Sequence, residues 1–505
     1  MNLPPTIRGV IFDFDGTLVD SESNYKAADR LFLQARGLTI TPEEQEGFTG
    51  IGVQGFLAEM RKRGLTGDAD QLIAEKDAAY LAYAAGRTRA FPRIIEFARY
   101  LYVQGIPMAI ATSSRRNVLD RILAETGIEI PFAATVAAED VRSHKPHPDV
   151  FLAAAERMGV DPATCLVVED SGFGVEGALA AGMRVVAVPA SRQSLQAETS
   201  ESPFDRSELL FDSPDEFDIG SVIERFDLTS EPEAFDEDTV KRFREAVHDF
   251  ARTGRRMMPW RETTDPYAIL VSELMLQQTQ TGRVGAFYSA FITRFPTFES
   301  LASSPFSEVL KQWQGLGYNR RARFLYDCAS IVVSRHAGRL PSEVDQLKAL
   351  PGIGPYTAAA VAAFAFGTPV SMIETNIRRV FIHFFFRGRG RVRDAEIMPL
   401  VEATLDRDDP RGWYYALMDY GASLVGLVPN PNRQSAHYNR QAPFAGSVRE
   451  VRGRILHEVT RHGRLTIRDL ERLVGPTDSR FIPALDGLEN ERLIVREADC
   501  IRPAE

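Results

Sequence analysis

The sequence has few cysteines and no long apolar run. Its 505 residues include three cysteines, Cys165, Cys328 and Cys500, which lie far apart. Widely spaced thiols predict reduced side chains, not disulfides or a cysteine-ligated cluster. No apolar run reaches the roughly 18 residues that a membrane helix needs, and no charged-then-apolar leader opens the chain. We therefore expect a cytoplasmic protein without a membrane partner.

The chain also lacks an excess of positive charge. Its formal net charge is −10, which argues against a protein that coats nucleic acid without specificity but allows local basic patches. The composition, 44% hydrophobic and 25% charged, is typical of a globular protein. A length of 505 residues exceeds what one core usually holds, so we expect at least two domains.

An acidic pair follows the first apolar run. Residues 10–19 read VIFDFDGTLV, and the period of a strand places Asp13 and Asp15 on the same side of the chain. Two carboxylates at one strand end repel each other unless a cation lies between them. Oxygen ligands of this kind suit Mg²⁺.

Polar residues also end two later apolar runs. Residues 108–114 read MAIATSS, residues 165–174 read CLVVEDSGFG, and Lys145 stands in a proline-rich segment between them. Strands alternate with helices here, which predicts a doubly wound parallel α/β sheet. Ligands of such sheets bind at the carboxyl ends of the strands. The side chains expected at that edge are Asp13, Asp15, Thr112, Lys145, Glu169 and Asp170.

These four motifs together resemble the haloacid-dehalogenase-like phosphohydrolases, over about residues 7–226. The resemblance implies that Asp13 is the nucleophile, Asp15 the acid/base, and Thr112 and Lys145 the phosphate ligands. It implies an Mg²⁺ site of Asp13, the Asp15 carbonyl, Glu169 and Asp170, and a helical cap at about residues 21–87.

Sugar-phosphate mutases of this family carry a histidine and an arginine where this chain has Tyr25 and Val53. This difference favours a phosphatase over a mutase. A small phosphorylated metabolite such as phosphoglycolate and a nucleotide monophosphate both stay open as substrates.

A glycine-rich turn precedes a helix in the second half of the chain. Residues 351–355 read PGIGP, and the alanine-rich residues 356–366 predict a helix. Gly352 and Gly354 allow a sharp turn with uncovered N–H groups, which at a helix N-terminus form an anion site. On a nucleic-acid-binding protein this anion would be a backbone phosphate.

Glu273 lies in residues 268–279, a helical stretch that is otherwise apolar around it. Partial desolvation there should raise its pKa, which suits a general acid that protonates a purine as the base leaves. Gln277 lies one turn later, with Gln278 and Thr279 adjacent. Their side chains could fill the stack or meet base edges when a nucleotide is flipped out.

Four motifs in this half resemble the helix-hairpin-helix DNA glycosylases, and most closely the mismatch-specific adenine glycosylases. The motifs lie at residues 258–284, 313–318, 350–380 and 418–422, within a region of about residues 235–438. The resemblance makes Gln278 and Tyr318 the residues that intercalate into DNA, with Leu316 beside them, and makes Arg261 and Glu273 face the extruded base. Other implied DNA contacts are Gln277, Thr279, Gly352, Gly354, Tyr356 and Asn376.

Tyr356 stands where strand-cleaving members of this family carry a lysine. Tyrosine cannot form a Schiff base, so we expect base excision without strand cleavage. Glu374 replaces the family's aspartate that stabilises the developing sugar cation, and we expect Arg378 and Arg379 to keep it ionised. Residues 423–444 lack the family's four cysteines, so no iron–sulfur cluster is expected.

The tail predicts three helices, at residues 448–460, 466–473 and 480–489, and a strand pair at residues 493–502. This is a winged-helix pattern, which serves either DNA binding or packing. The expected order is a phosphatase at residues 1–226, an acidic linker at 227–237, an all-α glycosylase at 238–444 and a winged helix at 445–505.

The predicted protein is a bifunctional fusion that acts on a small phosphate ester and on double-stranded DNA, at the nucleoid when bound. Adenine opposite guanine or 8-oxoguanine is the expected target. Two alternatives stay open: a thymine or uracil mismatch glycosylase, and a DNA-binding module whose glycosylase site has decayed.

Overall fold

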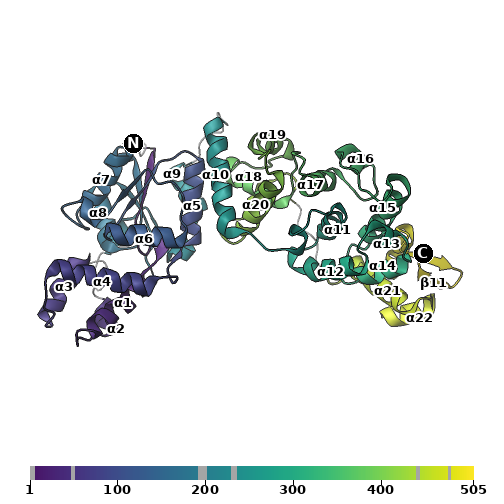
Figure 1. Ribbon diagram of the computed structural model, residues 1–505, viewed down its shortest axis with the longest axis horizontal. Helices are drawn as coiled ribbons and strands as arrows, with labels where there is room; N and C mark the ends of the chain where they lie inside the picture. Colours follow the sequence, from purple (N-terminus) through teal and green to yellow (C-terminus); the bar gives the residue numbers. More distant parts are fainter. Residues whose placement is uncertain (1–5, 47–51, 191–201, 229–235, 439–443, 476–478) are drawn as a thin grey trace. The chain divides into compact units, whose positions relative to one another are not determined.

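The computed structural model describes residues 6–46, 52–190, 202–228, 236–438, 444–475 and 479–505 (Figure 1). The chain forms two compact units. Unit 1 contains residues 1–254, 379–389 and 420–434, and unit 2 contains residues 255–378, 390–419 and 435–505. Residues 229–235, most of the predicted linker, lie outside the described residues. Within the described residues, no helix is long and apolar enough to cross a membrane.

Unit 1 is built on a six-stranded parallel sheet, as predicted. Its strands, in spatial order, are β5 (Ala134–Val136), β4 (Met108–Ala111), β1 (Gly9–Phe12), β6 (Cys165–Glu169), β7 (Arg184–Ala187) and β8 (Leu209–Leu210). In the register, Phe12 of the central strand β1 lies opposite both Ile110 and Val168. Because these strands end level with one another, the residues that follow them emerge at one edge.

Both faces of the sheet are buried, which explains why its strands are continuous apolar runs. Ile11 packs on one face with Phe151 and Val175, which belong to α7 (Asp149–Met158) and α8 (Gly172–Ala180). The next residue, Phe12, points to the other face and meets Phe97 of α5 (Pro92–Val103) edge to face. The remaining helices beside the sheet are α6 (Arg116–Thr126) and α9 (Ile219–Phe226) (Figure 1).

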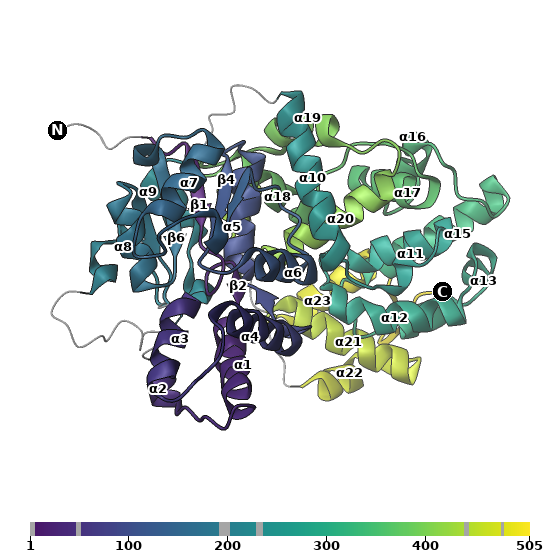
Figure 2. The ribbon, with the colours of Figure 1, turned by 60° about the vertical axis from the view of Figure 1, so that its left-hand side comes forward.

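A helical cap is inserted after β1, within the predicted range. Strands β2 (Val19–Asp20) and β3 (Arg89–Ala90) pair antiparallel and carry the chain out to the cap and back. The cap helices α1 (Glu22–Gln34), α2 (Pro42–Glu46), α3 (Gly52–Lys62) and α4 (Ala69–Ala84) form their own layer of unit 1 (Figure 2). Their small separate core includes Phe32, Phe56 and Leu72.

Unit 1 also contains the ends of two helices from the second half of the chain, besides α10 (Glu237–Gly254). These are the C-terminal parts of α18 (Thr375–Phe385) and α20 (Pro410–Ser423). Glu96 of α5 is 1% exposed and accepts hydrogen bonds from the Tyr420 hydroxyl at 3.0 Å to each carboxylate oxygen. The Nε2 atom of His383 lies 2.9 Å from the same carboxylate. Arg93 donates to the carbonyl oxygens of residues 426 and 427. The C-terminal ends of α18 and α20 are therefore part of the core of unit 1.

Unit 2 is helical. Its helices are α11 (Pro266–Leu276), α12 (Thr281–Arg294), α13 (Phe298–Ala302), α14 (Phe306–Trp313), α15 (Arg320–His336), α16 (Val344–Lys348), α17 (Pro355–Phe366) and α19 (Asp394–Thr404). Helix α11 begins where Asp265 accepts from two backbone N–H groups and Pro266 takes the first helical position. It ends where Arg321 donates to the carbonyl oxygens of Leu274 and Met275 at 2.9 and 2.7 Å. Both ends of the helix that carries Glu273 are therefore fixed by side chains.

The tail of unit 2 follows the predicted order of elements. It contains α21 (Val448–His462), β9 (Leu465–Thr466), α22 (Ile467–Val474), α23 (Phe481–Asn490), β10 (Ile494–Glu497) and β11 (Cys500–Pro503). Strands β10 and β11 form an antiparallel pair, and β9 adds a short third strand beside β11. Gln314 donates to the Leu456 carbonyl and Arg449 donates to the Tyr318 hydroxyl, so α21 contacts the helical part of unit 2.

Candidate active sites

The structure brings the predicted phosphatase residues together at the carboxyl edge of the sheet in unit 1. Asp13 directly follows β1, Thr112 follows β4, and Glu169 and Asp170 lie at the end of β6. Lys145 reaches the same point from the segment between β5 and α7. The carboxylates of Asp13, Glu169 and Asp170 lie within 4.8 Å of one another.

Lys145 is the cation of this site. Its ammonium lies 2.6 Å from Asp13 Oδ1 and 2.5 Å from Glu169 Oε1, and all three side chains are buried. Burial lowers the pKa of Lys145, but the two carboxylates outweigh burial and raise it overall. Burial raises the pKa of Asp13 to about 7, against the opposing effect of Lys145. One ammonium thus serves three carboxylates, which leaves an excess of negative charge.

The donor set fits Mg²⁺. The Oδ2 atom of Asp13 is buried without a hydrogen-bond partner, and burial and neighbouring carboxylates raise the pKa of Asp170 well above its usual value. An orphaned oxygen among crowded carboxylates suits a hard cation with oxygen ligands. Asp170 lies close to the backbone of Gly16, where an added Cβ would fall 1.9 Å from its Oδ2 atom. Gly16 therefore leaves the space that this carboxylate occupies.

Glu169 lies in the three-carboxylate cluster, so its predicted supporting role at the metal stays a prediction, and its oxygens also have partners within the protein. Its Oε1 atom accepts from Lys145, and its Oε2 atom accepts from the backbone N–H of Ser171 at 2.7 Å. Both oxygens are bonded, so this carboxylate positions Lys145 and the turn that follows β6. The side chain of Asp15 lies outside the three-carboxylate cluster. Its Oδ2 atom accepts from Ser114 Oγ at 2.5 Å, and Ser114 in turn contacts the Tyr25 hydroxyl.

Ser114 was missed in the sequence analysis, although the hydroxyls that end the run at residues 108–114 pointed to it. A hydrogen bond from Ser114 holds Asp15 in place, while the backbone N–H of Ser114 donates to Thr112 Oγ1 at 2.9 Å. A cavity of about 230 Å³ opens beside these residues and extends between the sheet edge and the cap. Tyr25 and Val53, where the mutases carry histidine and arginine, both line it.

The second site, in unit 2, joins Glu273, Tyr356 and Glu374. Glu273 of α11 is 5% exposed and forms a hydrogen bond with the hydroxyl of Tyr356 in α17. Burial raises the pKa of Glu273 to about 7; the nearby Glu374 carboxylate adds to this effect, while Tyr356 and Arg261 oppose it. This shift has the direction expected from the sequence. Glu273 can therefore hold a proton near neutral pH.

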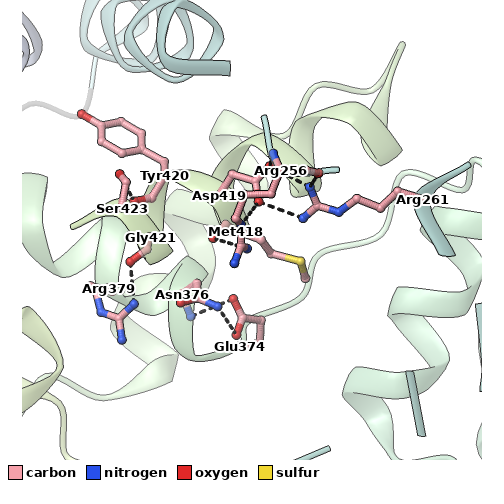
Figure 3. A network of polar contacts seen from close by, with 10 residues as sticks. All are labelled: Arg256, Arg261, Glu374, Asn376, Arg379, Met418, Asp419, Tyr420, Gly421 and Ser423. Atoms are coloured by element: carbon pink, nitrogen blue, oxygen red, sulfur yellow. Dashed lines mark hydrogen bonds and ion pairs between the residues drawn. The ribbon is translucent and has the colours of Figure 1, made fainter. Parts of the chain in front are cut away.

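Glu374 is held by the start of α18 (Figure 3). Its Oε1 atom accepts from the backbone N–H groups of Asn376 and Ile377 at 2.7 and 2.9 Å. Backbone donors at a helix N-terminus favour the carboxylate form. The expectation that Arg378 keeps Glu374 ionised needs correction, because its Nε and Nη2 atoms each donate to Asp394 at 2.7 Å.

The prediction that Arg261 faces an extruded base also needs correction. Arg261 is 6% exposed, and its guanidinium forms a two-pronged ion pair with Asp419, at 2.7 and 2.9 Å (Figure 3). Arg256 binds the same carboxylate, and Arg261 stacks over the ring of Tyr415. The buried Arg261 guanidinium acts on Glu273 through its charge, which lowers the pKa of that carboxyl. The sequence signal for Asp419 was its place in the motif at residues 418–422.

The predicted intercalating residues lie exposed, in a strained backbone conformation. Gln278 and Tyr318 have φ angles of 55° and 48°, in the left-handed region that side chains other than glycine rarely occupy. Such strain in exposed turns is typical of functional sites. Leu316 is only 2% exposed, so the expectation that it contacts DNA is corrected: it packs in the core.

Gln277 and Thr279 are partly exposed and also form hydrogen bonds within the protein. The Gln277 side chain donates to Thr357 of α17 at 3.1 Å, and Thr279 Oγ1 accepts from Arg321 at 3.1 Å. These bonds fix the turn that presents Gln278. The bond to Thr357 occupies one N–H of the Gln277 amide.

The glycine turn leads directly into α17, as expected. Gly352 has a φ of 76°, and a Cβ at this position would fall 2.5 Å from the Phe324 side chain. Gly354 is exposed and precedes α17, with open space around its missing Cβ. The N–H groups of this turn can therefore approach an anion closely.

Comparison with known proteins agrees with both sites. Residues 10–188 match the family model of the haloacid dehalogenase-like hydrolases, and residues 271–398 match that of the HhH-GPD superfamily of base excision DNA repair proteins. An adenine DNA glycosylase of Mycolicibacterium smegmatis is 37% identical over 219 residues, 40% of this chain and 75% of the relative. The chain is a haloacid dehalogenase-like hydrolase fused to an HhH-GPD superfamily DNA glycosylase. The fusion predicted from the sequence is confirmed.

Two further relatives match the glycosylase region, and one of them carries a different name. An adenine DNA glycosylase of Mycobacterium tuberculosis is 34% identical over 48% of this chain and 87% of the relative. A thymine/uracil-DNA glycosylase of Methanothermobacter thermautotrophicus is 34% identical over 36% of this chain and 85% of the relative. Among solved structures, CbbY from Rhodobacter sphaeroides resembles 41% of this chain, covering 95% of its own, at 25% identity and a TM-score of 0.36.

Proposed function

We propose that the hydrolase region is a phosphatase with Asp13 as its nucleophile. Asp13 would take the phosphoryl group from a small ester, and Asp15, oriented by Ser114, would protonate the leaving alcohol and later activate water. Lys145 and Thr112 would hold the phosphate oxygens. Bound Mg²⁺ would neutralise charge on the transferring group; Asp13, Asp170 and the Asp15 carbonyl would hold it, with Glu169 assisting.

For the glycosylase region we propose hydrolytic removal of a mispaired base, with adenine opposite guanine or 8-oxoguanine as the first candidate. The observation that supports this proposal is the pair Glu273 and Glu374: burial raises the pKa of Glu273 to about 7, and Glu374 accepts hydrogen bonds from two backbone N–H groups. Protonated Glu273 would donate to the leaving base, and ionised Glu374 would stabilise the cation-like sugar in the transition state. Water would then bond to the sugar carbon and lose its proton.

We further propose that this reaction leaves the DNA strand intact. The hydroxyl of Tyr356 bonds to Glu273, and a tyrosine supplies no amine for a Schiff base. Residues 423–444 contain no cysteine that could bind iron. We therefore propose a glycosylase that works without an iron–sulfur cluster. Residues 439–443 of that segment lie outside the described residues.

The second candidate is excision of thymine or uracil opposite guanine. The relative named thymine/uracil-DNA glycosylase favours it, at an identity equal to that of the Mycobacterium tuberculosis relative.

We propose the division into residues 1–226, 227–237, 238–444 and 445–505 for these activities, with the last part a winged helix. The contact of Arg449 with the predicted intercalating residue Tyr318 supports a place for this winged helix beside bound DNA.

Single-turnover excision on defined duplexes, followed by alkali, tests the glycosylase proposal. Wild type should excise adenine opposite 8-oxoguanine, and Glu273→Gln should lower the rate by roughly 100-fold or more, the usual scale for a general acid. Glu374→Gln should do comparable damage, and Glu374→Asp should preserve or raise the rate. Asp13→Asn should abolish phosphatase turnover and leave excision intact.

Asp345→Asn is the matched control for these variants, because its side chain is 95% exposed. Excision of thymine or uracil alone would select the second candidate. Tight DNA binding without excision by wild type or Glu374→Asp on any duplex would show a decayed site. Stoichiometric iron in the active preparation, by elemental analysis, would contradict the cluster-free proposal.

A further inference from the structure

The hydrolase cavity of unit 1 is lined by more acids than bases. Its described residues contribute six carboxyl groups and four cations. The carboxyl groups belong to Asp13, Asp15, Glu22, Asp29, Asp77 and Asp170, and the cations to Lys26, Lys76, Arg115 and Lys145. A substrate that enters this cavity therefore meets an excess of negative charge before a metal ion is counted.

Each of these four cations already forms an ion pair with a carboxylate of the same cavity. Lys145 pairs with Asp13 at 2.6 Å at the sheet edge. On the cap side, the pairs are Lys26 with Glu22 at 2.7 Å, Lys76 with Asp29 at 2.7 Å and Arg115 with Asp77 at 3.3 Å. Arg115 also pairs with Glu139 at 2.9 Å. The cap therefore presents neutral pairs to the part of the substrate that leaves.

Lys76 is held most firmly of the cap cations. Its side chain is 9% exposed and that of Asp29 is 13% exposed, so water screens the pair little. Its ammonium also lies over the rings of Tyr25 and Phe56, at 5.4 and 5.0 Å from their centroids. A second anion on the substrate would have to break this pair and leave the Asp29 carboxylate unpaired in a desolvated place, which is costly.

The size of the cavity sets a second limit. About 230 Å³ lies below the range of roughly 300–1,000 Å³ that holds drug-sized ligands. A nucleotide, with a ring system and a ribose beyond its phosphate, exceeds this space when the cap is in this position. A three- to five-carbon alcohol esterified with phosphate is a better match.

We infer that the hydrolase site selects a small phosphate monoester whose alcohol part is uncharged, because Asp29 and Asp77 neutralise the cations that would otherwise bind a second anion. This inference rests on the proposed phosphatase function and narrows it. It favours glycerol or pentose monophosphates. It disfavours phosphoglycolate, sugar bisphosphates and nucleoside monophosphates, each of which adds an anion or a bulky ring.

The test is a phosphate-release assay with the full chain, Mg²⁺ and paired substrates. Glycerol 3-phosphate and 3-phosphoglycerate have the same carbon number and differ by one carboxylate. Wild type should show a kcat/KM at least about tenfold higher for glycerol 3-phosphate, since one charge-assisted hydrogen bond is worth a factor of this order. Ribose 5-phosphate should likewise exceed ribulose 1,5-bisphosphate and adenosine monophosphate.

Two variants test the residues named. Asp29→Asn releases Lys76 with little change of shape, so it should raise the ratio of 3-phosphoglycerate to glycerol 3-phosphate turnover by about tenfold. Asp77→Asn removes one of the two carboxylate partners of Arg115 and leaves Glu139 at 2.9 Å, so it should raise the ratio by a smaller factor. The ratio is measured on one preparation, so a partial loss of folded protein does not affect it. Glu59→Gln, in an exposed pair with Lys62 on the cap helix α3, is the control and should leave the ratio unchanged.

The outcomes separate this inference from the proposed function. Hydrolysis of p-nitrophenyl phosphate that Asp13→Asn abolishes supports the phosphatase proposal whatever the natural substrate. If wild type hydrolyses p-nitrophenyl phosphate but prefers 3-phosphoglycerate or the bisphosphate, the inference is overturned and the phosphatase stands. If wild type hydrolyses no ester, both fall. An unchanged substrate ratio in both aspartate variants would overturn the role of Asp29 and Asp77.

Discussion

At the scale of single residues, two glutamates of the glycosylase site have different environments. Glu273 lies in an apolar helix with one hydroxyl partner, and Glu374 accepts two backbone N–H groups. The pattern of apolar neighbours around Glu273 predicted its raised pKa, because a helix that is apolar on every side is buried by the elements around it. The partner of Arg261 was not predictable in the same way, since Asp419 lies 158 residues further along the chain.

The pH dependence of excision is the first prediction at this scale. The pKa of Glu273 is raised to about 7, so its protonated form is complete below this pH and disappears as the pH rises through it. The single-turnover rate should therefore be level below about pH 6 and fall about tenfold per unit well above pH 7. Glu273→Gln should be slow and nearly independent of pH in this range. A wild-type rate that rises between pH 6 and 8 would contradict the assignment of Glu273 as the acid.

At the scale of elements, the turn after α11 is organised to expose one side chain. Arg321 binds the last carbonyl groups of α11, Gln277 donates to α17, and Gln278 is left exposed with a positive φ. Sequence periodicity predicted the helix, but not its end, because the residue that binds the last carbonyl groups comes from α15. The bonds of Gln277 explain why adjacent glutamines have different environments.

Gln278→Gly separates stability from activity in this turn. Glycine adopts a φ of 55° without the strain that a side chain meets, so the free energy of unfolding should rise by up to about 1 kcal/mol or stay level. Excision should fall because the exposed side chain is lost. Urea unfolding and single-turnover assays on one preparation measure both. Gln280→Gly, at a neighbouring exposed residue with a negative φ of −65°, is the control and should lower stability instead.

At the scale of the whole molecule, the two compact units do not follow the order of the sequence. Residues 379–389 and 420–434 belong with residues 1–254. Composition and motif order predicted the activities, because each motif is local. They could not predict this division, because it depends on hydrogen bonds between residues far apart in the chain. Tyr420 donates to Glu96 across 324 residues, and Arg93 donates to the carbonyl oxygen of Gly426.

Glu96→Ala tests the buried cluster of unit 1. Loss of this carboxylate leaves the Tyr420 hydroxyl and His383 without their shared partner, so the free energy of unfolding should fall by about 3 kcal/mol. Hydrogen exchange should rise at residues 379–389 and 420–434, which lie next to the lost group. Asp120→Asn, in an exposed pair on α6, should change neither. If the variant loses stability but exchange in those two segments is not faster, Glu96 does not hold the two segments in unit 1.

The sharing of unit 1 between both halves of the chain has a consequence for inheritance. A recombination or a stop codon between residues 226 and 237 would separate Glu96 from Tyr420 and Arg93 from its two carbonyl acceptors. Each of the two separated protein fragments would then expose residues that are buried in the intact unit 1. Selection should therefore keep the two reading frames joined even in a lineage where one of the two activities has become dispensable.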